Sequence, residues 1–376
     1  MNKGRFAALA VVFSSFGPQA SHAQTPKANA DVLLQRAMQE QERGDFAAAI
    51  RDYRKALTLQ PGETEARVNL GAALAHEGQF DAAIAEYRTA LPSLTFKEPV
   101  LLNMGLAYYK KHDFRSAQQQ FQAVHAAQPE NLRVAILLGD TDLHLGQAAD
   151  AVALLAPFEA GNSSNMDYEY VLGTALTETG AREEGVAKLE KVGAATKSAD
   201  AYLLAGSTLL KMNEYERSRR DLDAAVDLNP KLPGLLSLAG TARDKNGDVP
   251  AAEQAFRGAL QLNPDDFNAN LYLGAILYKR RELEDARRYL DHALQIDPKS
   301  SMAIYESAML KSNSGQIEAA VADLEKLAIS DPEWLEPHVA LASLYYRVNR
   351  PEDGAKQREI VGRLTAAQQA EGPGKP

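Results

Sequence analysis

The side chains best suited to chemistry are few and scattered along this sequence. The seven His residues form no close pair, and His76-Glu77 lacks the second His that a zinc protease motif places one helical turn later. Cysteine is absent, which excludes disulfides, thiolate metal sites and a thiol nucleophile. The sequence also contains no Gly-rich phosphate loop and no Gly-x-Ser-x-Gly elbow. It therefore predicts no catalytic residue, no metal site and no cofactor.

The composition is that of a folded, acidic chain. Of the 376 residues, 45% are apolar and 24% are charged. The 41 Lys and Arg residues against 50 Asp and Glu give a formal net charge of −9. Because phosphate backbones are bound mainly by Lys and Arg, this balance argues against nucleic acid as a partner.

The first 23 residues follow the pattern of a secretory signal peptide. Lys3 and Arg5 precede an apolar run over residues 6–16, and Ser21-His22-Ala23 is a small-x-small cleavage site. As a helix, this run would rise about 16 Å, whereas the hydrocarbon core of a membrane is about 30 Å thick. We therefore expect cleavage near Ala23, export to the periplasm or beyond it, and no stable membrane insertion.

The rest of the chain repeats a pattern about every 34 residues. Ten repeats begin at residues 30, 64, 98, 132, 166, 199, 233, 267, 301 and 335. The eighth position is always small: Ala37, Gly71, Gly105, Gly139, Gly173, Gly206, Gly240, Gly274, Ala308 and Ala342. The twentieth position is small too: Ala49, Ala83, Ala117, Ala151, Gly185, Ser218, Ala252, Ala286, Ala320 and Gly354. One turn later nine repeats carry a bulky residue, which we call the plug: Tyr53, Tyr87, Phe121, Leu155, Leu189, Leu222, Phe256, Leu290 and Leu324.

Each repeat fits two amphipathic helices joined by a short turn, such as Glu77-Gly78-Gln79. Small residues at a helix crossing let the axes approach closely, and the plug then fills the space between them. A hairpin of this length cannot bury its apolar face alone, so each repeat needs its neighbours. The pattern predicts an all-α chain with one continuous stack of helical hairpins.

These residues resemble the tetratricopeptide repeat, whose signature places Gly, Ala, an aromatic residue and Pro at fixed offsets. The resemblance implies an α-solenoid in the form of a right-handed superhelix, of the exported bacterial type, with about ten repeats over residues 30–363. Residues 24–29 are then a linker, and residues 364–376 are expected to be a disordered tail. In the tenth repeat Arg358 replaces the plug, as in a solvent-facing cap.

One segment of the array departs from the pattern. Pro157 falls inside the second helix of the fourth repeat, so we expect that helix to end near Ala156. The fifth repeat is one residue short and lacks the closing Pro. We interpret residues 157–198 as a weak joint, with drifted loop sequence as the alternative.

The resemblance also implies that the first helices line a concave groove that holds a ligand. The sixth position of the repeat carries Asn69 and Asn103, and residues at this position in the family often hydrogen-bond to the backbone of a bound peptide. The alternative is that both Asn residues are ordinary solvated polar side chains without a ligand. The twelfth position carries Tyr109, Tyr278 and Tyr346. Exposed Tyr residues suit peptide or glycan binding, whereas packing between neighbouring first helices is the alternative.

The thirteenth position changes character along the array. Its first five residues are mixed: Glu42, His76, Lys110, His144 and Glu178. The next five are mostly cationic: Lys211, Lys245, Lys279, Asn313 and Arg347. If these cations bind a ligand, it is an acidic protein segment or an anionic polymer. The alternative is that each cation only complements the negative end of its helix.

The function that follows is a non-enzymatic, exported scaffold that holds a protein segment in the groove. The main alternative is a glycan-associated accessory of envelope polysaccharide synthesis or secretion, with polysaccharide as a partner. A third class, single-stranded RNA binding, needs a basic groove, which the acidic composition opposes.

Overall fold

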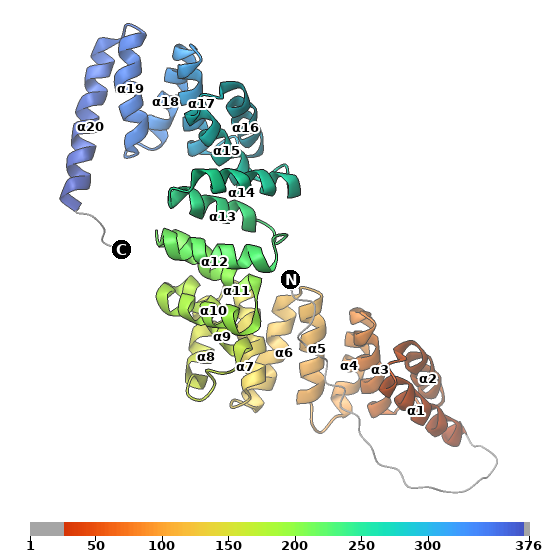
Figure 1. Cartoon of the computed structure of the whole chain (residues 1–376). Coiled ribbons are helices and arrows are strands. Elements are labelled where there is room, and N and C mark those ends of the chain that lie inside the picture. The colour runs from red at the N-terminus through yellow and green to blue at the C-terminus, as the bar shows by residue number, and fades with distance from the viewer. Residues whose placement is uncertain (1–25, 372–376) are drawn as a thin grey trace. The chain divides into compact units, whose positions relative to one another are not determined.

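The computed structural model describes residues 26–371, and the expected signal peptide over residues 1–23 lies outside this range. Every regular element in the described range is helical (Figure 1). The elements are α1 (Pro26–Glu42), α2 (Phe46–Leu59), α3 (Thr64–His76), α4 (Phe80–Ala90), η1 (Leu91–Ser93), α5 (Glu98–Lys110), α6 (Phe114–Ala127), α7 (Leu132–His144), α8 (Ala148–Leu155), η2 (Ala156–Phe158), α9 (Met166–Thr179), α10 (Arg182–Thr196), α11 (Ala199–Lys211), α12 (Tyr215–Leu228), α13 (Leu235–Lys245), α14 (Val249–Leu262), α15 (Phe267–Lys279), α16 (Leu283–Ile296), α17 (Ser301–Asn313), α18 (Ile317–Ser330), α19 (Leu335–Arg347) and α20 (Pro351–Glu371). The predicted all-α fold with two helices per repeat is confirmed.

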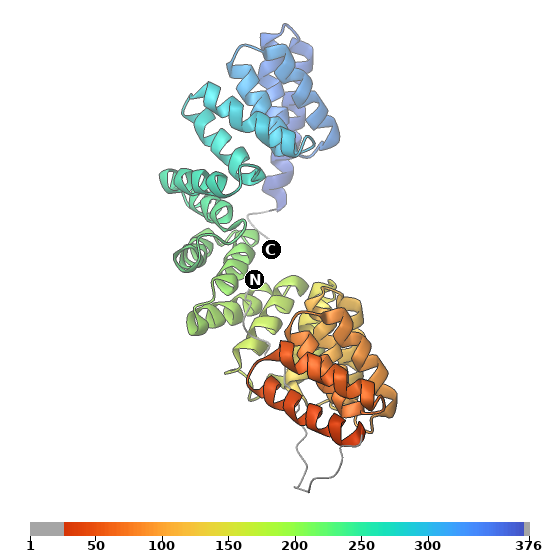
Figure 2. The ribbon, with the colours of Figure 1, turned by 90° about the vertical axis from the view of Figure 1, so that its right-hand side faces the viewer.

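The chain divides into two compact halves, residues 1–189 and residues 190–376. In the N-terminal half, first helices of neighbouring repeats touch: α1 contacts α3, α3 contacts α5, and α7 contacts α9. In the C-terminal half, α11 contacts α13, α13 contacts α15, and α15 contacts α17. Each half is thus a stack of helical hairpins (Figure 2). We call the side of each stack formed by the first helices the first-helix face.

The small eighth position works as the pattern predicts. A Cβ atom on Gly71 would lie 2.5 Å from Cε1 of the Tyr87 plug, and one on Gly105 would lie 2.6 Å from Cε1 of Phe121. Real Cβ atoms do not approach ring carbons so closely, so glycine is what lets the ring pack directly against the helix backbone. All nine plugs are buried: Tyr53, Tyr87, Phe121, Leu155, Leu189, Leu222, Phe256, Leu290 and Leu324.

The turn inside each hairpin is also built the same way throughout. One residue per turn has a left-handed backbone: Gly44, Gly78, His112, Gly146, Gly180, Asn213, Gly247, Arg281, Gly315 and Asn349. Glycine adopts this conformation without steric cost, whereas side chains with a Cβ atom do not. The position therefore favours glycine, and His112 and Arg281 hold it at some cost in stability.

Two predicted boundaries are wrong. Residues 26–29 of the expected linker belong to α1, and the expected disordered tail is helical from residue 364 through Glu371. Leu364 is buried against the preceding helices, and the Ala and Gln residues after it favour helix, so α20 continues past the last repeat. Residues 372–376 lie outside the described range.

The segment interpreted as a joint has unusual local structure. Helix α8 ends at Leu155 and is followed by a 3₁₀ turn that contains Pro157. Gly173 and Gly185 face each other, and a Cβ atom on Gly185 would lie 2.6 Å from the carbonyl oxygen of Gly173. Because α9 and α10 approach this closely, the fifth hairpin has little room for larger side chains. Mechanical weakness over residues 157–198 stays a prediction.

Candidate functional site

The two Asn candidates differ in their access to a ligand. Asn69 is only 8% exposed and lies beside the plug Tyr53, whose hydroxyl donates a hydrogen bond to Oε1 of Gln41 at 3.0 Å. Asn69 therefore supports the core instead of presenting its amide on the first-helix face. Asn103 is half-buried and remains a candidate contact on that face.

The N-terminal half gathers a polar and aromatic cluster around Tyr109, on α5. The Tyr109 hydroxyl donates a hydrogen bond to Oδ2 of Asp140, and it lies 2.9 Å from Nε2 of His144, both on α7. Phe114, at the start of α6, meets the Tyr109 ring edge-on at 5.3 Å and stacks on His144 at 4.2 Å. The sequence singled out Tyr109, and the structure adds Asp140, Phe114 and His144 as its neighbours.

The electrostatics of this cluster follow from its partial burial. Loss of water around Asp140 raises the pKa of its carboxyl group, while the Tyr109 hydrogen bond and the nearby His144 lower it. Burial and the charge of Asp140 likewise raise the pKa of the Tyr109 phenol. The Tyr109 hydroxyl has one proton, and that proton is used in the hydrogen bond to Asp140. His144 must then donate from Nε2 to the Tyr109 oxygen.

The two Tyr candidates of the C-terminal half are also engaged by neighbours. Asn313 donates a hydrogen bond to the hydroxyl of Tyr278 from the next repeat. The guanidinium of Arg358 lies 4.7 Å from the centre of the Tyr346 ring and donates to its hydroxyl. Arg358 thus covers Tyr346 where the other repeats bury a plug. Both Tyr hydroxyls accept a hydrogen bond from another side chain of the protein, and Tyr346 still exposes 43% of its surface.

The predicted cations lie in the last turns of their helices. Lys211, Lys245 and Lys279 close α11, α13 and α15, and all three are exposed. Lys279 lies near Glu306, whose pKa is raised by burial and lowered by that charge. Arg347 is exposed as well, and its Nη1 atom lies 3.4 Å from Oγ of Ser312.

Some residues of the first-helix face were missed by sequence reasoning. Tyr305 and Trp334 pack their rings 5.3 Å apart beside Glu306 in the C-terminal half. Asp140 is the ninth residue of its repeat, whereas the candidates predicted from the sequence occupy the sixth, twelfth and thirteenth positions.

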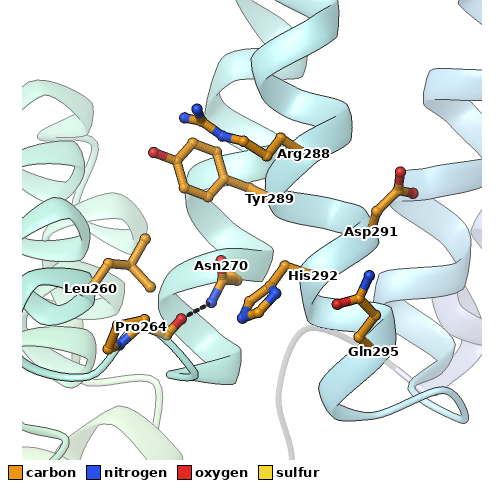
Figure 3. A pocket seen from close by; sticks show the side chains of 8 residues that line it. All are labelled: Leu260, Pro264, Asn270, Arg288, Tyr289, Asp291, His292 and Gln295. Atoms are coloured by element: carbon orange, nitrogen blue, oxygen red, sulfur yellow. Dashed lines mark hydrogen bonds between the residues drawn. The ribbon is translucent and has the colours of Figure 1, made fainter.

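Apart from the candidate residues above, a depression of about 500 Å³ lies beside the second helices α14 and α16 (Figure 3). It is lined by Leu260, Pro264, Asn270, Arg288, Tyr289, Asp291, His292 and Gln295. Asn270 donates to the carbonyl oxygen of Pro264 at 2.9 Å, which ties the helix to the loop before it. A second depression recurs one repeat later, at Leu294, Pro298 and Lys326. These hollows therefore follow from the repeat geometry.

Comparison with known families gives the identity of the repeats. Models described as tetratricopeptide repeat match residues 34–96, 108–163, 199–232 and 237–301, which together are more than half of the chain. The chain belongs to the tetratricopeptide repeat family. A crystal structure of a tetratricopeptide repeat protein from Parabacteroides merdae agrees in fold, with a TM-score of 0.51 and 15% identity over 66% of this chain and 99% of that one.

Curated relatives share only part of their length with this tetratricopeptide repeat protein. The human protein O-mannosyl-transferase TMTC1 is 24% identical over 199 residues, which are 52% of this chain and 22% of that protein. The cellulose synthase 1 operon protein C of Komagataeibacter xylinus is 35% identical over 72 residues, 19% of this chain and 5% of that protein. The chain thus spans about a fifth or less of these two relatives. Over residues 26–371, no helix is both long and apolar enough to span a membrane.

Proposed function

We propose that this tetratricopeptide repeat protein is a non-enzymatic, exported scaffold that holds an acidic protein segment on its first-helix face. The observation that supports the proposal is the row of Lys211, Lys245 and Lys279 in successive repeats of the C-terminal half. All three are exposed at helix ends. Like charges placed at regular spacing along one face attract an extended anionic partner and fix its register.

The alternative role of these cations is to complement the helix ends, which is worth about 0.3–1 kcal/mol each without any ligand. Asp244 and Glu306 also lie on this face, so the row is not uniformly positive. Binding and helix stabilisation make different predictions for a triple variant. The variant must therefore be judged on capture of a partner as well as on helicity.

Replacing Lys211, Lys245 and Lys279 together by Gln should weaken capture of the native partner about tenfold at low salt, which corresponds to about 1.4 kcal/mol. The measurement is an affinity pull-down by the mature chain from its native envelope, quantified against salt concentration. The control replaces Lys231, Lys299 and Lys326, three exposed lysines of the same half, by Gln. Equal capture by wild type and the first variant would show that these lysines only complement the negative ends of their helices.

A glycan-associated role in envelope polysaccharide synthesis or secretion is the second candidate. The similarity to the cellulose synthase 1 operon protein C favours it. Trp334 is the one Trp of the sequence, and its ring packs beside that of Tyr305 on the first helix α17. A titration with soluble cello-oligosaccharides should then change Trp334 fluorescence, and a flat titration would count against this candidate.

Export itself rests on the pattern of residues 1–23. N-terminal sequencing of the native protein should find a start near Gln24. A native chain that still begins at Met1 or Asn2 would overturn export by this route.

A further inference from the structure

The cluster around Tyr109 has a feature that the cation row does not explain, namely a carboxylate held among aromatic rings. We propose that Asp140 and its ring neighbours form a subsite for one basic side chain, Arg or Lys, of a protein bound on the first-helix face. This inference rests on the scaffold function proposed above. It adds a cation-binding position in the N-terminal half to the anion-binding row of the C-terminal half.

Asp140 has spare capacity to accept a hydrogen bond. Its Oδ2 atom accepts from Tyr109, and within residues 26–371 no other side chain donates to its carboxylate. His144 lowers the pKa of Asp140, and no Lys or Arg of this range is among the groups that shift it. A partly desolvated carboxylate without a Lys or Arg partner is costly, and an incoming guanidinium or ammonium group lowers that cost.

The surrounding rings suit a cation as well. Tyr109 and Phe114 meet edge-on at 5.3 Å, and Tyr109 and His144 meet edge-on at 5.6 Å. Cations are attracted to ring faces, and the attraction grows when both groups are partly removed from water. The side chains of Tyr109, Asp140 and Phe114 are half-buried and His144 is exposed, so a long, flexible basic side chain can reach the carboxylate from solvent.

The positions of these side chains are fixed before a ligand arrives. His144 is held between the Phe114 ring and the Tyr109 hydroxyl, and Tyr109 in turn holds Asp140. Because the partners come from α5, α6 and α7, their geometry is set by packing between the third and fourth repeats. A preorganised carboxylate loses little side-chain entropy when a cation binds.

The test uses the full mature chain and two capped pentapeptides that differ only at the centre, Arg in one and Gln in the other, flanked by Gly and Ser. Ligand-observed NMR at low salt should show at least fivefold tighter binding of the Arg peptide to wild type. Asp140→Asn keeps the shape and should bring the two peptides within twofold of each other. Phe114→Leu, which removes one ring, should reduce the preference by about half.

The matched control is Asp227→Asn, which removes an exposed carboxylate of α12 and should keep the full preference. Circular dichroism of each variant checks that helicity is unchanged. Equal binding of the two peptides by wild type, or a preference that survives in Asp140→Asn, overturns the inference. The pull-down of the native partner tests the proposed scaffold function separately. If the native partner is captured but wild type shows no preference for the Arg peptide, the subsite is wrong and the scaffold function stands. If wild type prefers the Arg peptide but captures no native partner, the scaffold function is wrong and the subsite stands.

Discussion

The two halves of the chain use the thirteenth position of the repeat in opposite ways. In the N-terminal half, His76 stacks on Phe46 at 3.6 Å and His144 stacks on Phe114 at 4.2 Å, so each His is fixed by the preceding repeat. In the sixth to ninth repeats, the residues that correspond to Phe46 and Phe114 are Tyr215, Val249, Leu283 and Ile317, of which one is aromatic. The thirteenth position of the C-terminal half carries Lys, Asn or Arg. One backbone pattern therefore carries stacked His and Phe rings in one half and exposed cations in the other.

The plugs differ between the halves as well, and they give the largest expected effect. Phe121→Ala should cost the N-terminal half about 3–5 kcal/mol of unfolding free energy, and Leu290→Ala should cost the C-terminal half about 2–5 kcal/mol, because both side chains are fully buried. Urea unfolding followed by circular dichroism reports the whole chain, while Trp334 fluorescence reports the C-terminal half. Phe121→Ala should leave the Trp334 transition in place. Equal shifts of both signals in both variants would show that the halves unfold as one.

A buried carboxyl group in each half predicts how stability varies with pH. Burial raises the pKa of Asp142 and of Asp221 from 3.8 to about 6. Folding therefore favours the protonated form, and the stability that this contributes is complete below pH 3.8 and is lost as the pH rises through about 6. Asp142→Asn and Asp221→Asn should each be about 1–3 kcal/mol more stable than wild type at pH 7.5.

The control for this pair is Asp227→Asn, at an exposed site where no such gain is expected. Urea midpoints between pH 4 and pH 8 measure the effect, and both buried variants should show a flatter pH profile. A loss of stability in Asp142→Asn at pH 7.5 would mean that its 2.6 Å hydrogen bond from Gln118 requires the charged oxygen.

The boundary between the halves can be probed by limited proteolysis. We expect first cuts within residues 157–198, roughly tenfold faster than elsewhere in the array, because Pro157 ends the second helix α8 early and a 3₁₀ turn follows it. Mass spectrometry of the first fragments locates the cuts. First cuts spread evenly over all repeats would show that this segment is as firm as the others.

The smallest effect concerns the turns. Arg281 has a left-handed backbone with φ 65°, so Arg281→Gly should stabilise the C-terminal half by about 0.5–1 kcal/mol. The reverse change at a neighbouring turn, Gly247→Ala at φ 88°, should destabilise it by about 1 kcal/mol. The midpoint of the Trp334 transition measures both. A destabilised Arg281→Gly variant would show that the charge of Arg281 near Tyr278 outweighs the backbone strain.

The sequence was sufficient for the fold because small slots and plugs recur in register, and the burial of Phe121 and Leu222 confirms that reading. It was less sufficient for the candidate site. Asn69 is buried beside Tyr53 of the preceding repeat, and the contact between Tyr109 and His144 likewise joins residues of different repeats. Such contacts depend on which side chains meet across a repeat junction, and single-repeat patterns do not describe that.

The contact between Gly71 and Tyr87 stays within one repeat, whereas the bond between Tyr109 and His144 crosses to the next. A gene that gained or lost one whole repeat by recombination would keep each plug against its own glycine. It would change the residue that each Tyr on the first-helix face meets. Repeat duplication can therefore rewrite the surface of such a protein while its core stays the same, so related proteins can share packing and differ in their ligands.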